Sequence, residues 1–253
     1  QVEVARPTLM VASPATRRLL ADARARVPVL CGPMYPGSNV ELVAAVSSAG
    51  GLGVVQPLSA THLYGAPTLR AALRELKELT TAPFGVNLTL LPTKRYQRRV
   101  DEWLDVALEE GVTFFLTSLG KPNDVAKIAR AAGATVYHDV HTPEVAAKVV
   151  DHVDGLVCLN TSMGGQTGSF GAADFVRQLP AAIRDHVPLV CAGGVGGTKD
   201  LCNALELGYA GVQCGTRFLA TPECRVSDAY KRAVVSATSE DIVWTNKMSG
   251  TNA

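Results

Sequence analysis

Two glycine-rich segments late in the chain have the composition of phosphate-binding turns. The segments "AGGVGG" (192–197) and "CGTRF" (214–218) each end a short apolar run. Backbone N–H groups at the start of a helix suit a dianionic phosphate, and glycine lets the ligand approach closely. Thr216 adds a hydroxyl donor. Either segment alone could be an ordinary tight turn, but two at successive strand ends favour a phosphate site.

A third segment, "NTSMGGQTG" (160–168), raises the question of acid–base chemistry. A phosphate at the two later turns leaves room for a planar ring, with Gly164 and Gly165 beside it and "GPM" (32–34) on its other side. Gln166 follows these glycines, at a point where an acid or base would be expected. A side-chain amide cannot take up a proton near neutral pH, although it can donate a hydrogen bond.

His138 is the candidate for a substitute acid or base. It lies near the end of the apolar run 134–140, next to Asp139. Side chains alternate across a strand, so neighbours do not all face the same way. The alternative is a histidine that is hydrogen-bonded within its loop and takes no part in chemistry.

The elements that must position these residues alternate along the chain. β-branched runs predict strands at 27–31, 52–55, 84–90, 113–118, 134–140, 155–159, 187–194 and 210–216. Helical spacing predicts helices at 39–50, 67–79, 96–111, 122–133, 142–152, 172–183 and 198–208. Eight strands in this order predict an α/β fold of the (β/α)₈ or TIM-barrel type. A doubly wound sheet is the alternative, but "CGPMYPGSN" (31–39) after the first strand lacks its G-x-G-x-x-G spacing.

Composition sets the limits of this interpretation. The chain has 253 residues, is 47% hydrophobic and 19% charged, and carries a net charge of +1. These values are typical of a folded protein and give no argument for a nucleic-acid or membrane partner. No signal segment or membrane-length apolar run is visible, so we expect a cytoplasmic protein. We expect residues 1–26 to form an N-terminal extension and 27–253 a single barrel domain.

The six cysteines include no C-x-x-C pair, so no metal site is expected. Most are predicted to be small buried hydrophobes. Cys31 is the best candidate for a reactive thiol, because it opens a Gly-Pro loop at a strand end.

An ordered set of motifs resembles the FMN-dependent nitronate monooxygenase family, also called 2-nitropropane dioxygenase. The motifs are "PVLCGPM", "ELVAAVSSAGGLGVV", "PFGVNL", "GGQTG", "VCAGGVGG" and "GVQCGTRFLAT". The resemblance covers roughly residues 27–253, and the family also includes an FMN-dependent enoyl-acyl-carrier-protein reductase. It implies an oxidoreductase with FMN at the C-terminal mouth of the barrel. The family usually continues beyond position 253, so we expect further C-terminal residues that form part of a lid.

The resemblance also implies roles for individual residues. Met34, beside Gly32, would touch the flavin ring through its backbone, and Asn87 would hydrogen-bond the ring. Gln213 would lie close by. The phosphate would be held by Gly193, Gly194, Gly215 and Thr216.

Gln166 departs from the family pattern, which has a histidine base in a "GGH-x-G" loop. A nitroalkane needs a base to lose its α-proton, whereas a nitronate is already the anion. Since losing a general base lowers a rate by about 10²–10⁴-fold, we expect nitronates to be oxidised with O₂ in preference to neutral nitroalkanes. Asp139 stands where some relatives have lysine. Because this change matches one subgroup of the family, it indicates little about function.

Two other functions stay open at this stage. The first is an NAD(P)H-dependent flavin reductase acting on an enoyl thioester or quinone. The second is a flavin-binding protein with little catalysis, which the missing histidine motivates. A homodimer is also left open.

Overall fold

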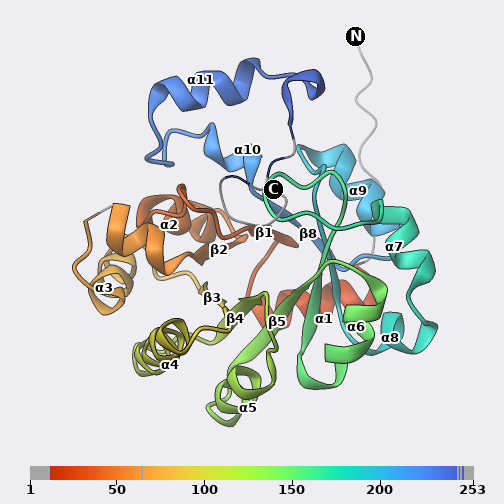
Figure 1. The fold of residues 1–253 in the computed structure, drawn as a ribbon, viewed down its shortest axis with the longest axis horizontal. Helices are drawn as coiled ribbons and strands as arrows, with labels where there is room; N and C mark the ends of the chain where they lie inside the picture. Colours follow the sequence, from red (N-terminus) through yellow and green to blue (C-terminus); the bar gives the residue numbers. More distant parts are fainter. Residues whose placement is uncertain (1–11, 64, 244, 246, 248–253) are drawn as a thin grey trace.

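The eight predicted strands form a closed parallel barrel in chain order. The structure is a computed structural model that describes residues 12–63, 65–243, 245 and 247. The strands are β1 (Val29–Cys31), β2 (Leu52–Val55), β3 (Phe84–Thr89), β4 (Phe114–Ser118), β5 (Thr135–Val140), β6 (Gly155–Leu159), β7 (Leu189–Ala192) and β8 (Gly211–Cys214). β1 pairs with both β2 and β8, which closes the ring (Figure 1). The TIM-barrel prediction is confirmed.

Helices surround the barrel. They are α2 (Val40–Ser48), α3 (Leu69–Leu79), α4 (Lys94–Glu109), α5 (Asn123–Ala131), α6 (Pro143–Val149), α7 (Ala172–Gln178), α8 (Ala181–His186) and α9 (Thr198–Glu206). The predicted helix 172–183 is two helices, because Pro180 has no N–H to donate and holds Leu179 in an extended conformation with ψ of 133°. A π-helical turn, η1 (Ser59–Leu63), and a 3₁₀ turn, η2 (Val150–His152), were not predicted.

Each strand of the barrel buries side chains on both of its faces. Alternate residues such as Leu116 and Tyr137 point into the barrel and form one apolar cluster with α1. The residues between them, such as Val136 and Phe115, point outward and pack with the helices. This period of two decides which side chains can reach the barrel mouth.

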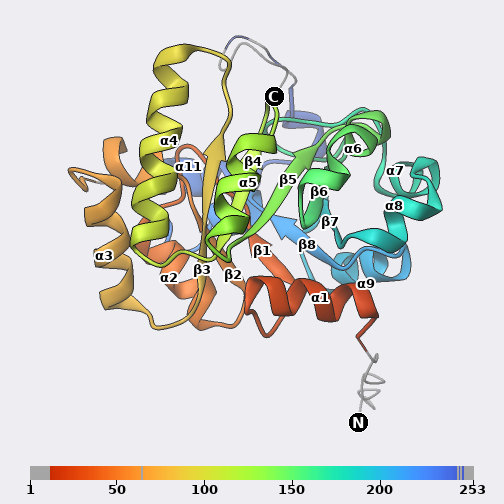
Figure 2. The same cartoon turned by 90° about the horizontal axis from the view of Figure 1, so that it is seen from below.

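The helix α1 (Pro14–Ala23) lies within the segment expected to be an extension. Ser13 caps it, and its side chains Leu19 and Ala23 join the interior cluster. The Tyr137 hydroxyl donates to Asp22 over 3.0 Å. Figure 2 shows α1 lying across one end of the barrel. Residues 1–11 of the expected extension, and 248–253 at the other terminus, lie outside the described residues.

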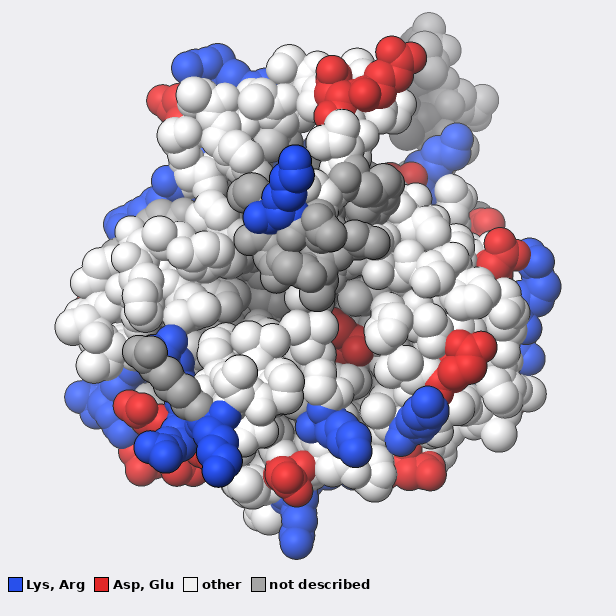
Figure 3. All heavy atoms as spheres, in the orientation of Figure 1, with Lys and Arg blue, Asp and Glu red and all other residues white. Residues whose placement is uncertain are grey.

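Three further elements follow β8: α10 (Thr216–Leu219), α11 (Asp228–Ser236) and η3 (Ser239–Asp241). In Figure 1, α11 stands outside the ring of helices and neighbours α10. Acidic and basic side chains are interspersed on the face seen in Figure 3. No helix in the described part of the chain is long and apolar enough to cross a membrane.

Candidate active site

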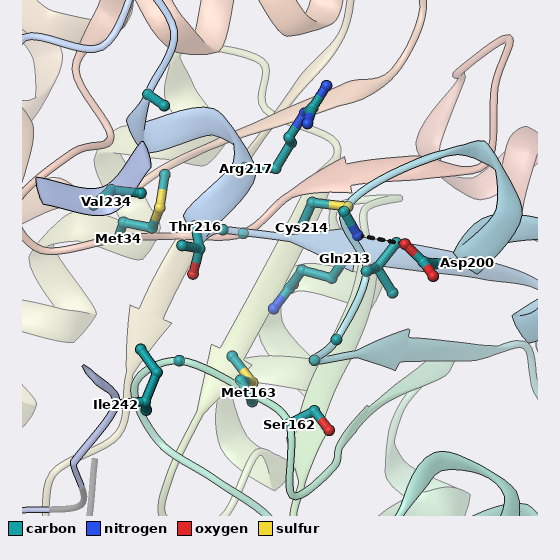
Figure 4. Close-up of a pocket in the computed structure, with 18 of the residues that line it drawn as sticks. Met34, Ser162, Met163, Asp200, Gln213, Cys214, Thr216, Arg217, Val234 and Ile242 are labelled. Carbon is teal, nitrogen blue, oxygen red and sulfur yellow. Dashed lines mark hydrogen bonds between the residues drawn. The ribbon is translucent and has the colours of Figure 1, made fainter. Parts of the chain in front are cut away.

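A cavity of about 910 Å³ lies at the carboxyl ends of β1, β6, β7 and β8. Eight of the predicted cofactor-binding residues line it: Gly32, Met34, Gly164, Gly193, Gly194, Gln213, Gly215 and Thr216. Figure 4 shows side chains from these loops arranged around the cavity. The segment from α11 onward adds four lining residues that were not predicted, because no chemical signal marks them: Val234, Val235, Ser239 and Ile242.

Asn160 joins the loop after β6 to the loop after β7. Its Nδ2 donates to the carbonyl of Gly193 over 2.9 Å, and its Oδ1 accepts from the Ser162 N–H over 2.8 Å. Gly193 has φ of +117°, and a Cβ there would lie 2.4 Å from Asn160 Oδ1. Only glycine fits this conformation and this contact. Sequence reasoning missed Asn160, although it directly follows a buried strand.

Several amides of the loop after β7 are already engaged within the protein. The Gly194 N–H donates to the Ser162 carbonyl over 3.1 Å. The N–H groups of Gly196 and Gly197 donate to Asp200 Oδ2 over 2.9 and 3.0 Å, and Figure 4 draws the Asp200 carboxylate at the cavity. The glycines of this loop therefore shape the wall, and few of their N–H groups are left for a phosphate.

Thr216 provides a donor that is available. It lines the cavity, and in Figure 4 its hydroxyl points toward the loop that carries Met163. A Cβ on Gly164 would lie 3.1 Å from Thr216 Oγ1, so the two residues face each other closely. The segment that begins at Gly215 is thus the best phosphate cradle at this cavity.

Gln213 presents an unsatisfied acceptor. Its side chain is buried and points into the barrel mouth, and its Oε1 has no partner in the described part of the chain. A Cβ on Gly32 would come within 3.0 Å of Gln213 Cγ, which explains the glycine there. A buried acceptor without a donor is costly, so this atom fits a bound group that carries an N–H, such as a flavin ring.

Met34 lines the cavity with its side chain, but its backbone is engaged elsewhere. Its N–H donates to Ser38 Oγ over 2.8 Å, and its carbonyl accepts from Ser59 Oγ over 2.7 Å. Its sulfur would lie 3.4 Å from a Cβ on Gly215. A flavin contact through the Met34 N–H would have to replace the bond to Ser38.

The structure does not bring His138 to the cavity. It lies on the outward face of β5, with Val136 and Val140, and shares a 2.8 Å hydrogen bond with Thr117 Oγ1. Burial lowers the pKa of its imidazole to about 4. The ring has no access to the barrel interior, so we do not propose it as the acid or base.

Gln166 and Gly165 lie in the loop after β6 but do not line the cavity. Gly165 has φ of +105° and open space around it. Gln166 is half-buried. The loop is anchored behind them by Gly168, where a Cβ would lie 1.8 Å from the Leu159 carbonyl oxygen.

Asn87 and Asp139 face the barrel interior on the opposite side of the mouth and do not line the cavity. Asn87 Nδ2 donates to Ser118 Oγ over 2.9 Å, and Ser118 Oγ donates to Asp139 Oδ2 over 2.6 Å. Burial raises the pKa of the Asp139 carboxyl to about 7, although the Ser118 hydrogen bond opposes the shift. Alternation along β5 puts Asp139 on the same face as Tyr137, and the structure places that face in the interior.

The thiols give no sign of reactivity. Cys31 is fully buried, and burial raises its pKa. Burial likewise raises the pKa of Cys214, which lines the cavity, to about 11. Within the described residues, no group of His, Cys, Asp or Glu side chains could hold a metal ion.

Comparisons with known proteins identify the family of this chain. A family model for nitronate monooxygenase matches residues 17–253. A nitronate monooxygenase from Pseudomonas aeruginosa is 31% identical over 270 residues, which cover 89% of this chain and 75% of the relative. A (3aS,4S,5R,7aS)-5-hydroxy-7a-methyl-1-oxo-octahydro-1H-indene-4-carboxyl-CoA dehydrogenase from Rhodococcus jostii is 31% identical over 224 residues. That match covers 88% of this chain but only 60% of the relative.

Two solved structures resemble the whole fold. FabK from Thermotoga maritima superposes with a TM-score of 0.81 at 29% identity, covering 93% of this chain and 73% of that one. A nitroalkane oxidase from Streptomyces ansochromogenes has a TM-score of 0.79 at 25% identity, covering 93% and 78%. These matches confirm the expected enzyme class, an FMN-dependent oxidoreductase. The chain belongs to the nitronate monooxygenase family.

Proposed function

We propose that this chain binds FMN in the cavity and oxidises alkyl nitronates with O₂. The observation that carries the proposal is the cavity itself, which gathers eight predicted cofactor-binding residues from four strand ends. Family membership supports a small-molecule substrate and FMN chemistry. Bound FMN would supply the electron acceptor for the substrate and the route to O₂.

The residues present fit such a group. Thr216 would donate to the phosphate, with backbone amides from Gly215 onward. Gln213 Oε1 would accept from a ring N–H, which satisfies its buried and unpaired oxygen. Met34 and Met163 would form apolar walls beside the ring.

Gln166 favours an anionic substrate. Its amide cannot remove a proton, and Gln166 lies in the loop beside the cavity without lining it. A nitronate already carries the negative charge that deprotonation would create. A site with Gln166 in place of a histidine base can therefore still oxidise nitronates.

The first test is the visible spectrum of the purified protein, followed by anaerobic mixing with ethylnitronate. We expect FMN-like absorbance that bleaches on mixing and returns when O₂ is admitted. A flavin that ethylnitronate leaves oxidised would overturn this function. A colourless protein that does not bind added FMN would overturn the cofactor as well.

A second candidate is an NAD(P)H-dependent flavin reductase acting on an enoyl thioester. The likeness to FabK and to a carboxyl-CoA dehydrogenase supports it. Fast anaerobic reduction of the flavin by NADH or NADPH would favour this function over the first. A third outcome is that the wild-type protein turns over neither nitronates nor enoyl thioesters, whereas Gln166→His does. That result would indicate a flavin-binding protein with little catalysis.

A further inference from the structure

Three polar side chains cross the interior face of the barrel at its carboxyl end. They are Asn87 of β3, Ser118 of β4 and Asp139 of β5. Asn87 Nδ2 also donates to the Leu116 carbonyl over 2.9 Å, which fixes the amide. Asn87 donates to Ser118, and Ser118 donates to Asp139 Oδ2. The carboxylate is therefore the final acceptor of this series of hydrogen bonds.

The carboxyl of Asp139 is unusual in its surroundings. The interior positions around it are apolar, including Tyr137 on its own strand and Val157, its register partner on β6. Its Oδ1 is buried and has no partner among the residues described here. A carboxyl in a packed interior normally has both oxygens satisfied, so this oxygen, which lacks a donor, is free to take up a proton.

We propose that Asp139 is the proton acceptor of this active site, and that it removes the α-proton of a neutral nitroalkane. This inference rests on the proposed function and extends its substrates from nitronates to their conjugate acids. The carboxylate takes the α-proton, and the C–H electron pair moves into the C=N bond as negative charge collects on the nitro oxygens. No electron leaves the substrate in this step, so it needs no oxidant, and Asp139 later returns the proton to solvent.

The electrostatics suit this role. With the Asp139 pKa at about 7, the carboxylate and the acid are both populated near neutral pH. The neighbours Ser118 and Asn87 are uncharged. The thiol of Cys158 on β6 has a pKa raised by burial, and the His138 ring faces the other side of β5 with a pKa of about 4.

The experiment compares nitroethane and ethylnitronate as reductants of the FMN-loaded protein in anaerobic stopped flow. Asp139→Asn keeps the size and the hydrogen bond from Ser118 but cannot accept a proton. We expect this variant to slow flavin reduction by nitroethane about 10²–10⁴-fold. The rate of flavin reduction by ethylnitronate should stay within about threefold of the wild-type rate. Asp139→Glu should recover part of the loss. Asp124→Asn, an exposed change on α5, is the matched control and should behave as wild type.

The two proposals fail in different ways. If ethylnitronate does not reduce the wild-type flavin, the proposed function is overturned, and Asp139 loses its assigned substrate with it. If ethylnitronate reacts but nitroethane does not, or if Asp139→Asn changes both rates equally or neither, only the role of Asp139 is overturned.

A second readout does not use the flavin. Carbon-13 labelling of aspartate, with Asp139→Asn to assign the signal, gives the titration of this carboxyl by NMR in the folded protein. We expect a midpoint near 7. A midpoint near the ordinary value of about 4 would overturn the inference whatever the kinetics show. Circular dichroism of each variant checks that it is folded.

Discussion

The side chain of Asn160 donates a 2.9 Å hydrogen bond to the carbonyl of Gly193, and this bond joins the loops that follow β6 and β7. The same side chain accepts from Ser162, whose carbonyl in turn holds the Gly194 N–H. One buried amide therefore sets the position of both glycine segments that wall the cavity.

Asn160→Ala should loosen both loops. The change leaves the Gly193 carbonyl and the Ser162 N–H without partners, which costs about 1–3 kcal/mol of unfolding free energy. Because looser loops preorganise the cavity less well, FMN affinity should fall about tenfold, which corresponds to about 1.4 kcal/mol of binding free energy. Urea unfolding and FMN titration measure the two effects. Asn203→Ala on the exposed face of α9 should change neither, and equal effects from both variants would contradict the role of Asn160.

Thr216→Val should weaken FMN binding through the phosphate alone. Loss of one hydroxyl donor to a charged group costs about 1.5–3 kcal/mol, or roughly 10–150-fold in Kd. Riboflavin lacks the phosphate, so its Kd should be the same for the variant and the wild type. Thr216→Ser should keep most of the FMN affinity. A riboflavin Kd that rises as much as the FMN Kd would show that the valine disturbs the whole cavity.

Gly168→Ala should destabilise the loop that carries Gln166. The new Cβ would lie 1.8 Å from the Leu159 carbonyl oxygen, so the loop or β6 must shift. We expect a loss of about 2–3 kcal/mol or more in unfolding free energy. Gly171→Ala is the control, because a Cβ there would lie 3.8 Å from its nearest neighbour, Asp174 Oδ2. This change should cost at most about 1 kcal/mol of unfolding free energy. Similar losses for both would contradict the close contact.

Glu110 should make stability depend on acid pH. Its carboxylate, with only 8% of the side chain exposed, accepts hydrogen bonds of 2.8–3.0 Å from three cations of α3: Arg70, Arg74 and Lys77. The Lys77 hydrogen bond, followed by those from the two arginines, lowers the Glu110 pKa to about 2. Because the folded-state pKa is depressed, the stabilisation is complete above the ordinary glutamate value of about 4.3 and is lost as the pH falls toward 2.

The test for Glu110 is thermal unfolding between pH 2 and 7. Glu110→Gln should lose about 0.2–1 kcal/mol per pair at pH 7 and converge with the wild type near pH 2. Glu102→Gln, an exposed change on α4, the helix that ends just before Glu110, is the control. Parallel curves for wild type and Glu110→Gln across this range would contradict the assignment.

Thiol labelling should find one accessible cysteine. Cys202 is half-buried on α9, whereas the other five cysteines are buried. Burial also raises the pKa of Cys31, Cys158 and Cys191, which removes the reactive thiolate. We expect one thiol per chain to react rapidly with Ellman's reagent, and none in Cys202→Ser. Rapid labelling of Cys31 would restore the reactive role that its place in the sequence suggested.

The order and type of the main elements could be predicted from residue patterns. The period of two marked the barrel strands, and helical spacing marked α2 to α9, with the boundary at Pro180 as the main difference. The helix α1 was missed because its apolar stripe is short and lies in an arginine-rich segment. Its burial depends on the open end of the barrel, which is a tertiary feature.

The sequence by itself determined the barrel and the set of glycine turns at its mouth, because strand periodicity and turn chemistry are local properties. Tertiary structure alone decided which polar groups are available there. Strand register turned His138 outward to Thr117 and Asp139 inward to Ser118, although the two are neighbours in the chain. Packing of the loops engaged the Gly194 N–H and left Gln213 Oε1 without a partner. Such pairings join residues far apart in sequence, so no local pattern encodes them.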